Sequence, residues 1–225
     1  MCIRDSLLSI GNNQYLLGLG DGGSGSDPHS HGQNKNNSLG SINLFSFENN
    51  EIKPVLEDSD KDPYVLHYGL RNPWRFSLGV DNMLWISDVG QNCWEEVNLV
   101  TMNETKNLGW SSKEAYQDFE KNTNCDLSEN NQDEDLTYPV AYYGHQDGNC
   151  SITGGYWMDW GPPSLSDGYL YGDFCTGIMW LLKEENGNWE SEYIGHAGGM
   201  IVGFGKGLGE ELLIFLWTGN IIAIK

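Results

Sequence analysis

One short pattern recurs along this chain: an apolar stretch of strand-forming residues that ends in an Asp and a Gly-rich turn. The copies lie at residues 15–23, 84–90, 169–177 and, without the Asp, 212–219. The spacing is uneven, with 67 residues from Asp21 to Asp88, 85 from Asp88 to Asp173 and 44 from Asp173 to the equivalent Trp217. A repeated strand and turn with insertions of varying length predicts the blades of a β-propeller.

Glycine content and charge narrow the class of protein. The 225 residues include 29 Gly, many beside Asp or Asn, a combination that forms turns between short strands. Asp and Glu number 32 against 12 Lys and Arg, and the net charge of -20 would repel a nucleic-acid backbone or an anionic membrane surface. No apolar run approaches the roughly 20 residues of a membrane span. The sequence therefore predicts an all-β protein that binds no nucleic acid and has no membrane span.

The Asp that closes each copy has two interpretations. At the end of an apolar strand it would lie at the mouth of the central channel, where a propeller binds its cofactor. Alternatively, each carboxylate accepts hydrogen bonds from the backbone N–H groups of its own turn. For any single copy, the second interpretation is favoured.

Two polar stretches, 22–37 and 114–135, are predicted to be long surface loops, which often carry function. The second contains a run of acidic residues: Asp118, Glu120, Asp126, Glu129, Asp133, Glu134 and Asp135. This run lacks the fixed alternation and the Gly of a dedicated calcium loop. A solvated acidic loop is favoured over a calcium site.

The cysteines indicate the compartment. None forms a Cys-x-x-Cys pair, so zinc or thioredoxin-like chemistry has no support. Apart from Cys2, four cysteines could form two disulfides in any of three connectivities: Cys93, Cys125, Cys150 and Cys175. An oxidising compartment is favoured, which makes the protein secreted or periplasmic, and buried free thiols are the alternative. Residues 1–6 are polar, unlike a signal peptide, and are expected to be a non-native start to a domain spanning 7–225.

Three segments together resemble the glucose/sorbosone dehydrogenase family. They are Gly20-Asp21-Gly22-Gly23-Ser24-Gly25, then Gly69-Leu70-Arg71-Asn72-Pro73-Trp74-Arg75-Phe76 with the strand that ends in Asp88-Val89-Gly90, and Ser151-Ile152-Thr153-Gly154-Gly155-Tyr156 with the 168–177 strand. The resemblance extends from about Leu7 to about Phe204, and 69–91 is its most specific part. It implies a six-bladed propeller, of which 225 residues would form an N-terminally truncated piece of about four blades.

The family uses pyrroloquinoline quinone (PQQ) and calcium, and the resemblance implies roles for particular residues. Arg71 and Asn72 would contact the quinone, since a guanidinium fork matches carboxylate geometry. Composition alone would instead pair Arg71 with a nearby carboxylate. Asp21 would orient a catalytic His that takes the proton from the anomeric hydroxyl of the sugar. Backbone carbonyls near Gly109 and Trp110 would help to hold the calcium ion.

The chain also departs from the family pattern. The catalytic His lies upstream of the Gly-rich loop in the family and is absent here, so the chain alone is expected to be inactive. His29 and His31 follow Asp21 and are interpreted as loop histidines. Ser41, Leu44 and Ile178 stand where the family commonly has Lys or Arg, which would reduce the cationic contacts to the cofactor.

The function that the resemblance implies is an enzymatic one, the oxidation of aldose sugars at C1 to lactones. Electrons would pass from PQQ to an external acceptor. A second interpretation is a binding propeller similar to the hedgehog-interacting-protein-like proteins, which fits the Cys-rich third segment and the lost cations. A calcium-dependent lactone-hydrolysing propeller is disfavoured, because no counterpart of its carboxylate metal cage is evident.

Overall fold

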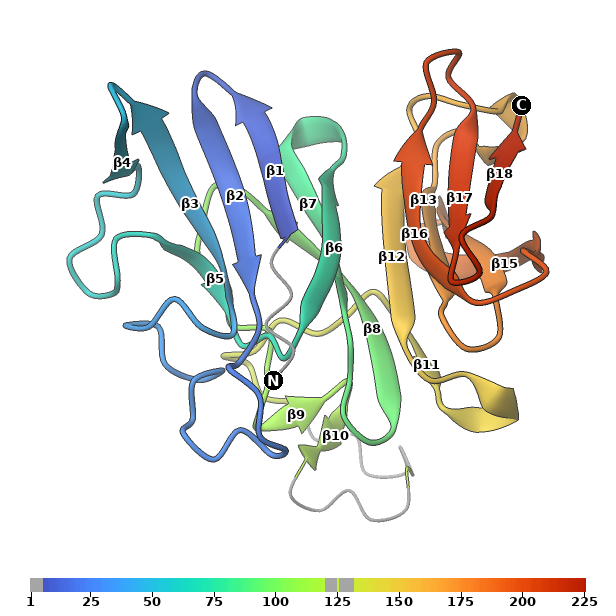
Figure 1. Ribbon diagram of the computed structural model, residues 1–225. Helices are drawn as coiled ribbons and strands as arrows, with labels where there is room; N and C mark the ends of the chain where they lie inside the picture. The colour runs from blue at the N-terminus through green and yellow to red at the C-terminus, as the bar shows by residue number, and fades with distance from the viewer. Residues whose placement is uncertain (1–5, 120–124, 126–131) are drawn as a thin grey trace.

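The computed structural model describes residues 6–119, 125 and 132–225 (Figure 1). Strands dominate it, as the sequence predicts. The first sheet has the order β1 (Ser6–Gly11), β2 (Gln14–Leu19), β3 (Ser41–Glu48) and β4 (Glu51–Pro54), with β5 (Val65–Tyr68) also paired to β3. The second has the order β6 (Pro73–Leu78), β7 (Met83–Asp88), β8 (Trp94–Thr101) and β11 (Ala141–Gly144).

Two further sheets complete the row. The third has the order β12 (Ile152–Trp157), β13 (Tyr169–Asp173), β14 (Ile178–Glu185) and β15 (Asn188–His196), and the fourth has β16 (Ile201–Lys206), β17 (Leu212–Leu216) and β18 (Ile221–Ile224). A small hairpin joins β9 (Lys113–Glu114) to β10 (Gln117–Asp118), and short 3-10 turns lie at Val80–Asn82, Gln146–Gly148 and Pro163–Leu165. All pairings within the sheets are antiparallel. No helix among the described residues is long and apolar enough to cross a membrane.

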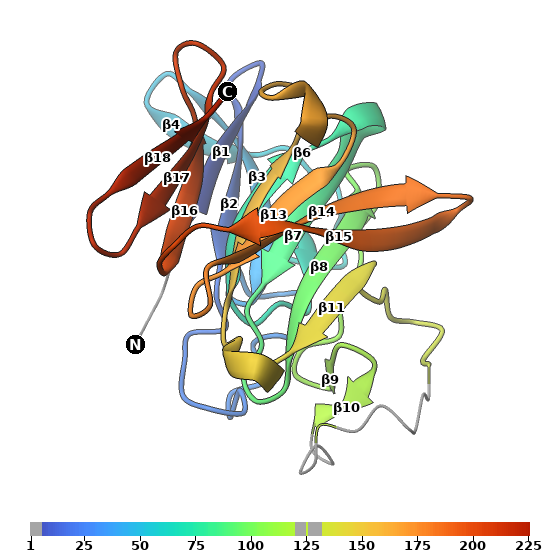
Figure 2. The ribbon, with the colours of Figure 1, turned by 90° about the vertical axis from the view of Figure 1, so that its right-hand side faces the viewer.

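The four sheets are arranged like propeller blades. The first strand of each sheet contacts the first strand of the next, β1 against β6, β6 against β12, and β12 against β16. The first and last sheets stand at opposite sides of the row in Figure 1, and Figure 2 shows the same sheets from the side. This arrangement confirms the predicted propeller architecture of about four blades. The four copies of the sequence pattern coincide with the second strands of the four sheets, β2, β7, β13 and β17.

Alternation along the second strands builds the core between blades. In β7, Leu84 and Ile86 pack toward the first sheet, whereas Trp85 between them packs toward the third. Successive side chains of a strand point to opposite faces, so a strand buried on both faces has almost no polar position. Trp85 stacks on Tyr169 of β13, with ring centroids 4.8 Å apart. Each interior blade therefore joins two apolar clusters.

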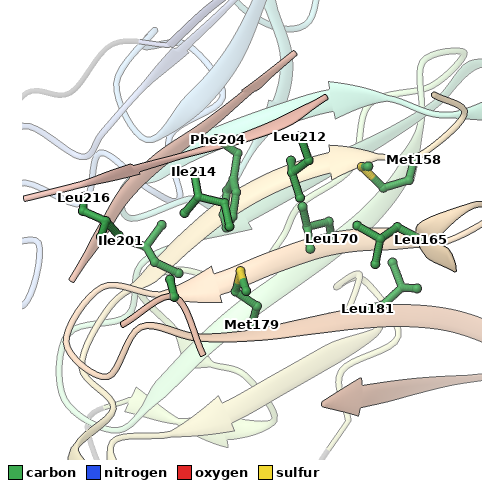
Figure 3. Close-up of a cluster of buried hydrophobic side chains, with 11 residues drawn as sticks. Met158, Leu165, Leu170, Met179, Leu181, Ile201, Phe204, Leu212, Ile214 and Leu216 are labelled. Carbon is green, nitrogen blue, oxygen red and sulfur yellow. The ribbon is translucent and has the colours of Figure 1, made fainter. Parts of the chain in front are cut away.

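A third apolar cluster joins the third and fourth sheets (Figure 3). Leu170 points into it from β13, opposite in direction to Tyr169. Phe204 of β16 and Ile214 of β17 meet it from the other side, as Figure 3 shows. At about 25 cal/mol per Å² of apolar surface, such clusters are the main favourable term in the stability of the fold.

Two disulfides resolve the connectivity that the sequence left open. Cys93 pairs with Cys125, and Cys150 with Cys175, with Cα atoms 5.3 and 5.7 Å apart. The second disulfide joins the segment before β12 to the turn after β13. Their presence fits the predicted oxidising compartment. Cys2 lies outside the described residues.

Truncating Phe204 to Ala should lower the free energy of unfolding by about 3–5 kcal/mol, because it removes an almost fully buried ring (2% exposed) from the cluster between blades. Leu208 is fully exposed nearby in the chain, so Leu208→Ala should change stability by no more than about 0.5 kcal/mol. Urea denaturation of both variants measures the difference. Equal effects would contradict the assignment of this core.

Replacing Cys150 and Cys175 together with Ala should destabilise the protein by about 3 kcal/mol, because the cross-link closes a loop of 25 residues and restricts the unfolded chain. The midpoint of thermal unfolding under non-reducing conditions gives the measurement. Wild-type protein heated with reductant serves as the comparison, and it should lose at least as much because it also opens Cys93–Cys125. An unchanged midpoint in the double variant would argue that this disulfide does not stabilise the fold.

Candidate functional site

Asp88 fixes the backbone of the most specific sequence segment. Its Oδ2 accepts a hydrogen bond from the Arg71 N–H at 2.9 Å, and its Oδ1 accepts one from the Asn72 N–H at 2.6 Å. These two residues lead directly into β6. The Asp at the end of the second strand therefore holds the entry to the first strand of the same blade.

Asp173 makes the same contact in the third blade. Its Oδ2 accepts hydrogen bonds from the N–H groups of Cys150 and Ser151, at 3.0 and 2.9 Å, and these residues lead into β12. Its Oδ1 accepts hydrogen bonds from the backbone N–H and the hydroxyl of Thr176 in its own turn. The contact with the Thr176 N–H confirms the own-turn interpretation for Asp173, but neither sequence interpretation anticipates the partners Cys150 and Ser151 earlier in the chain.

Asp21 joins distant segments instead. Its Oδ1 accepts a hydrogen bond from the Gly23 N–H of its own turn, and its Oδ2 accepts one from the Trp110 indole N–H at 2.9 Å. The Asp21 N–H donates to the Arg71 carbonyl at 2.9 Å. Three of the residues that the sequence selected, Asp21, Arg71 and Trp110, therefore meet in one cluster, which we call the Arg71 cluster.

The Arg71 guanidinium is held by carbonyls rather than by a carboxylate. Nη1 donates to the carbonyls of Val89 and Gly90 at 2.8 and 2.6 Å, and the guanidinium carbon lies 5.8 Å from the centre of the Trp110 ring. Among the described hydrogen bonds, this group uses Nη1 alone, so Nη2 and Nε keep their donors. A planar cation fixed on two sides in this way suits an anionic, planar ligand.

Asn72 supplies an unsatisfied acceptor beside this cation. Its Oδ1 is buried and has no hydrogen-bond partner in the described part of the protein. Buried polar atoms without partners are uncommon and often mark a position that a ligand or a water completes. Arg71 and Asn72 together therefore fit the end of a ligand that carries both an acidic group and a hydrogen-bond donor.

The Gly109 and Trp110 carbonyls fit calcium less well. The Gly109 carbonyl already accepts hydrogen bonds from the N–H groups of Ser112 and Lys113, at 2.8 and 2.9 Å. The Trp110 carbonyl accepts one from the Gln33 side-chain amide, which leaves one lone pair. No group of three or more metal-ligating side chains occurs among residues 6–119, 125 and 132–225. Of these two carbonyls, that of Trp110 is the better placed to take part in holding a cation.

The loop 22–37 lies against this cluster, which sequence analysis did not anticipate. His31 Nδ1 lies 2.7 Å from the Asp21 carbonyl oxygen, and Gln33 is hydrogen-bonded to both Asn107 and Trp110. Asp27 fixes the loop through the N–H groups of His31 and Gly32. Nothing in the local sequence marks these long-range partners, since Asn, Gln and Asp are typical of any exposed loop.

Gly69 allows the segment before Arg71 to lie against the segment that contains Trp110. Its φ is +82°, a conformation that side chains rarely adopt, and a Cβ there would collide with the backbone of Leu108 and Gly109. The Gly69 carbonyl accepts a hydrogen bond from the Trp110 N–H at 3.0 Å. The Gly that opens the sequence motif is therefore required for Trp110 to reach Arg71.

Two buried carboxyl groups lie behind the cluster. Asp88 and Glu96 are paired across β7 and β8, and both are almost fully buried. Burial raises the pKa of Asp88 to about 7, against the opposing effect of its two backbone donors and Arg71. Burial, and then the nearby Asp88 charge, raises the pKa of Glu96 to about 8. We conclude that Glu96 keeps its proton while Asp88 carries the charge that orders the Arg71 segment.

The acidic stretch 114–135 contains both buried and exposed carboxyl groups. Glu114 is buried, and its carboxylate accepts hydrogen bonds from the N–H groups of Gln91, Asn92 and Cys93. Asp133, Glu134 and Asp135 are exposed, as predicted for a solvated loop. Glu120, Asp126 and Glu129 lie outside the described residues. The first residue of the predicted surface loop is thus a structural anchor of the β7–β8 connection.

The three departures from the family pattern occupy positions with different burial. Leu44 belongs to the apolar cluster between the first two sheets, and Ser41 is fully buried with its hydroxyl donating to the Ser38 carbonyl. Ile178 is half-buried at the start of β14. A Lys or Arg at position 44 would place a charge in an apolar core. The apolar residue there is consistent with the packing of this chain.

These features define a class: a disulfide-bonded β-propeller with a cationic, aromatic corner where its first two blades meet. Residues 5–157 match the Glucose / Sorbosone dehydrogenase family, which is more than half of the chain, and the chain belongs to that family. The HIPL2 protein of Arabidopsis thaliana is 32% identical over 216 residues, and the HIPL1 protein of the same plant is 30% identical over 206. These matches cover 82% and 80% of this chain but only 30% and 29% of the relatives.

Solved structures show the same fold at low identity. The PQQ-bound aldose sugar dehydrogenase of Streptomyces coelicolor superposes with a TM-score of 0.64 at 17% identity, covering 90% of this chain and 52% of that one. The apo-form soluble aldose sugar dehydrogenase of Escherichia coli gives a TM-score of 0.69 at 15% identity, with coverage of 97% and 62%. The chain therefore spans between half and two thirds of these propellers.

Replacing Glu96 with Gln should flatten the pH dependence of stability. Unfolded Glu96, with a pKa of 4.5, is ionised at neutral pH, whereas folded Glu96 keeps its proton up to about pH 8. Folding therefore takes up a proton between about pH 4.5 and 8, and the free energy of unfolding of the wild type should fall as pH rises from about 6.5 to 8 and level off above that. Gln imitates the protonated side chain and should remove the part of this fall that Glu96 causes.

Urea unfolding at several pH values gives the measurement. Glu190→Gln makes the same charge change at an exposed position of β15, and its curve should run parallel to that of the wild type. His67 does not confuse the comparison above pH 6.5, because its folded pKa is lowered to about 3 by burial and by Lys61 and Lys106. If the curves of Glu96→Gln and Glu190→Gln coincide, Glu96 is not the protonated group.

Proposed function

We propose that this chain is part of a secreted or periplasmic sugar dehydrogenase that oxidises aldoses at C1 with PQQ, and that the Arg71 cluster binds the quinone. Membership of the glucose/sorbosone dehydrogenase family supports this, as does the PQQ-bound state of one structural neighbour. The two disulfides support the compartment. A small-molecule sugar would be the substrate, and an external molecule would accept the electrons.

The observation that carries the proposal is the preorganised Arg71. Its guanidinium is fixed by the Val89 and Gly90 carbonyls and lies near the Trp110 ring, yet keeps donors at Nη2 and Nε. A cation that is ordered before the ligand arrives binds a carboxylate with little loss of side-chain entropy. PQQ, when bound, supplies the acceptor for the hydrogen that leaves the sugar. The protein supplies position and charge.

Other residues of the cluster would act by positioning. Asn72 Oδ1, buried and without a partner, would accept a hydrogen bond from the ligand. Asp21 would orient the base that takes the sugar proton, in the role that the family assigns to it. In the present structure its carboxylate is already hydrogen-bonded to the Trp110 indole and to Gly23, which fixes its direction. The base itself is not assigned to any described residue.

Calcium is included in the proposal only because the family uses it. Of the two carbonyls expected to hold it, that of Trp110 keeps a free lone pair, whereas that of Gly109 is used by two backbone donors. Calcium takes six to eight oxygen ligands, so further ligands would have to come from water, from the quinone or from elsewhere in the protein.

The second candidate function is a binding propeller without catalysis. The two curated relatives are HIPL proteins, and the hedgehog-interacting-protein-like interpretation predicts such relatives. The apolar or neutral residues at positions 41, 44 and 178 also favour it, because the cofactor would have fewer cations. The two functions differ in one measurable property, the saturable binding of PQQ.

Calorimetric titration of the chain with PQQ should show saturable binding that Arg71→Gln weakens by about 10- to 100-fold, which corresponds to one charge-assisted hydrogen-bonded contact. Arg71→Lys keeps the charge but not the fork and should recover only part of the affinity. Lys225→Gln removes one positive charge at an exposed terminal residue and should bind like the wild type. Binding is the chosen readout because the chain spans only part of the solved enzymes.

Absence of saturable heat in the wild type would overturn the PQQ proposal and favour the binding propeller. Equal weakening in Arg71→Gln and Lys225→Gln would overturn the assignment to Arg71, because net charge alone would then explain the loss.

A further inference from the structure

Three lysines gather around one cavity, away from the guanidinium of the Arg71 cluster. The cavity has a volume of about 410 Å³, and Lys35, Lys61 and Lys106 all line it. They are three of only 12 Lys and Arg in a chain with a net charge of -20. The three come from separate segments, the loop after β2, the connection between β4 and β5, and the stretch after β8. The fold therefore brings three of its few cations to one cavity, which Asp58, Glu134 and Asp135 also line.

Lys61 is the unusual member of the three. It is only 7% exposed, and its Nζ donates to the Val65 carbonyl at 2.7 Å and to the Thr105 hydroxyl. An ammonium has three donors, so one remains. No carboxylate in the described part of the chain forms an ion pair with it. Burial is the main reason that the pKa of Lys61 is lowered, with Lys35 adding to the effect and Asp58 opposing it.

The pKa of His67 is affected by two of these lysines. It is fully buried on β5, next in sequence to Tyr68 of the cavity wall, and its Nδ1 accepts a hydrogen bond from the Lys106 N–H at 3.2 Å. After burial, the charges of Lys61 and Lys106 are the causes that lower its pKa. The ammonium groups of Lys61 and Lys106 therefore lie close enough to His67 to act on it.

The rest of the lining limits the ligand. The hydroxyl-bearing residues Tyr68, Thr105 and Thr137 and the exposed carboxylates of Asp58, Glu134 and Asp135 line the same cavity. Carboxylates would repel a bare inorganic anion but accept hydrogen bonds from hydroxyl groups. The lining therefore suits a molecule with an anionic group at one end and hydroxyl groups at the other. A volume of about 410 Å³ lies within the range of small-molecule sites.

We propose that this cavity binds a small hydroxylated carboxylate of the sugar-acid class, with its carboxylate between Lys61 and Lys106 and its hydroxyls toward Glu134 and Asp135. The site is separate from the proposed quinone contacts and does not depend on them. Asn107 lies in the wall of the cavity and also bonds Gln33, so the two regions are neighbours.

Gluconate is the probe, titrated calorimetrically into the full chain without PQQ. It should bind saturably, and Lys106→Gln should weaken binding about tenfold, the value of one charge-assisted contact. Lys53→Gln is a matched control, because Lys53 is also a partly exposed lysine paired with a Glu two residues away, with 49% of its side chain exposed against 34% for Lys106. It should bind gluconate like the wild type. Lys61→Met, checked for folding by its unfolding midpoint, should abolish saturable binding.

Glucose and inorganic phosphate separate the parts of the proposal. Both should bind at least about tenfold more weakly than gluconate, glucose because it lacks the carboxylate and phosphate because it lacks the hydroxylated carbon chain. Three results would each overturn the proposal: no saturable heat with gluconate, equal losses in Lys106→Gln and Lys53→Gln, or affinity for phosphate or glucose equal to that for gluconate. Because PQQ is absent, failure here leaves the quinone proposal to its own test.

Discussion

A buried carboxylate that binds two backbone N–H groups is the interaction on which this fold depends. Asp88 holds the segment before β6, and Asp173 holds the segment before β12, each through the two residues that precede the strand. A carboxylate removed from water needs such donors, since an unpaired buried charge is very unfavourable. The strand-ending Asp therefore sets where each inner strand begins. In the second blade, the segment set in this way is Arg71-Asn72, so a general device of the fold also orders the candidate site.

Burial, and after it the charge of Asp88, explains why the pKa of the neighbouring Glu96 is raised. Asn98 donates to Glu96 Oε2, while its own Oδ1 is buried without a partner. Burial and repulsion from Asp88 favour the protonated form of Glu96, against the hydrogen bonds that it accepts from the Ala115 N–H and the Asn98 amide. The charge is then left on Asp88, where Arg71 and two N–H groups stabilise it.

The sequence predicts those features that arise from local chemistry. Alternating apolar residues and Asp-Gly turns are properties of one strand and its turn, so the all-β class, the four copies and Asp21 could be found without a structure. The roles of Arg71 and Trp110 came from the resemblance to the family. The hydrogen-bond partners of these residues could not be predicted from the sequence. Asp21 meets Trp110 across 89 residues, and Asp88 binds residues that precede it by 16 and 17. Glu114 was indistinguishable from its exposed acidic neighbours, because burial depends on the packing of β7 and β8 against the hairpin.

The large negative charge and the two cationic places are compatible for a physical reason. At physiological ionic strength, the Debye length is about 8 Å, so exposed carboxylates beyond that distance act weakly on a ligand within a site. Arg71 and Lys61 are held close to where a ligand would lie, one by two carbonyls and the other by a carbonyl and a hydroxyl. Short-range geometry therefore decides anion binding, whereas the net charge governs encounter and keeps polyanions away. The two proposed sites would thus allow an acidic propeller to bind small carboxylates while its net charge repels polyanions.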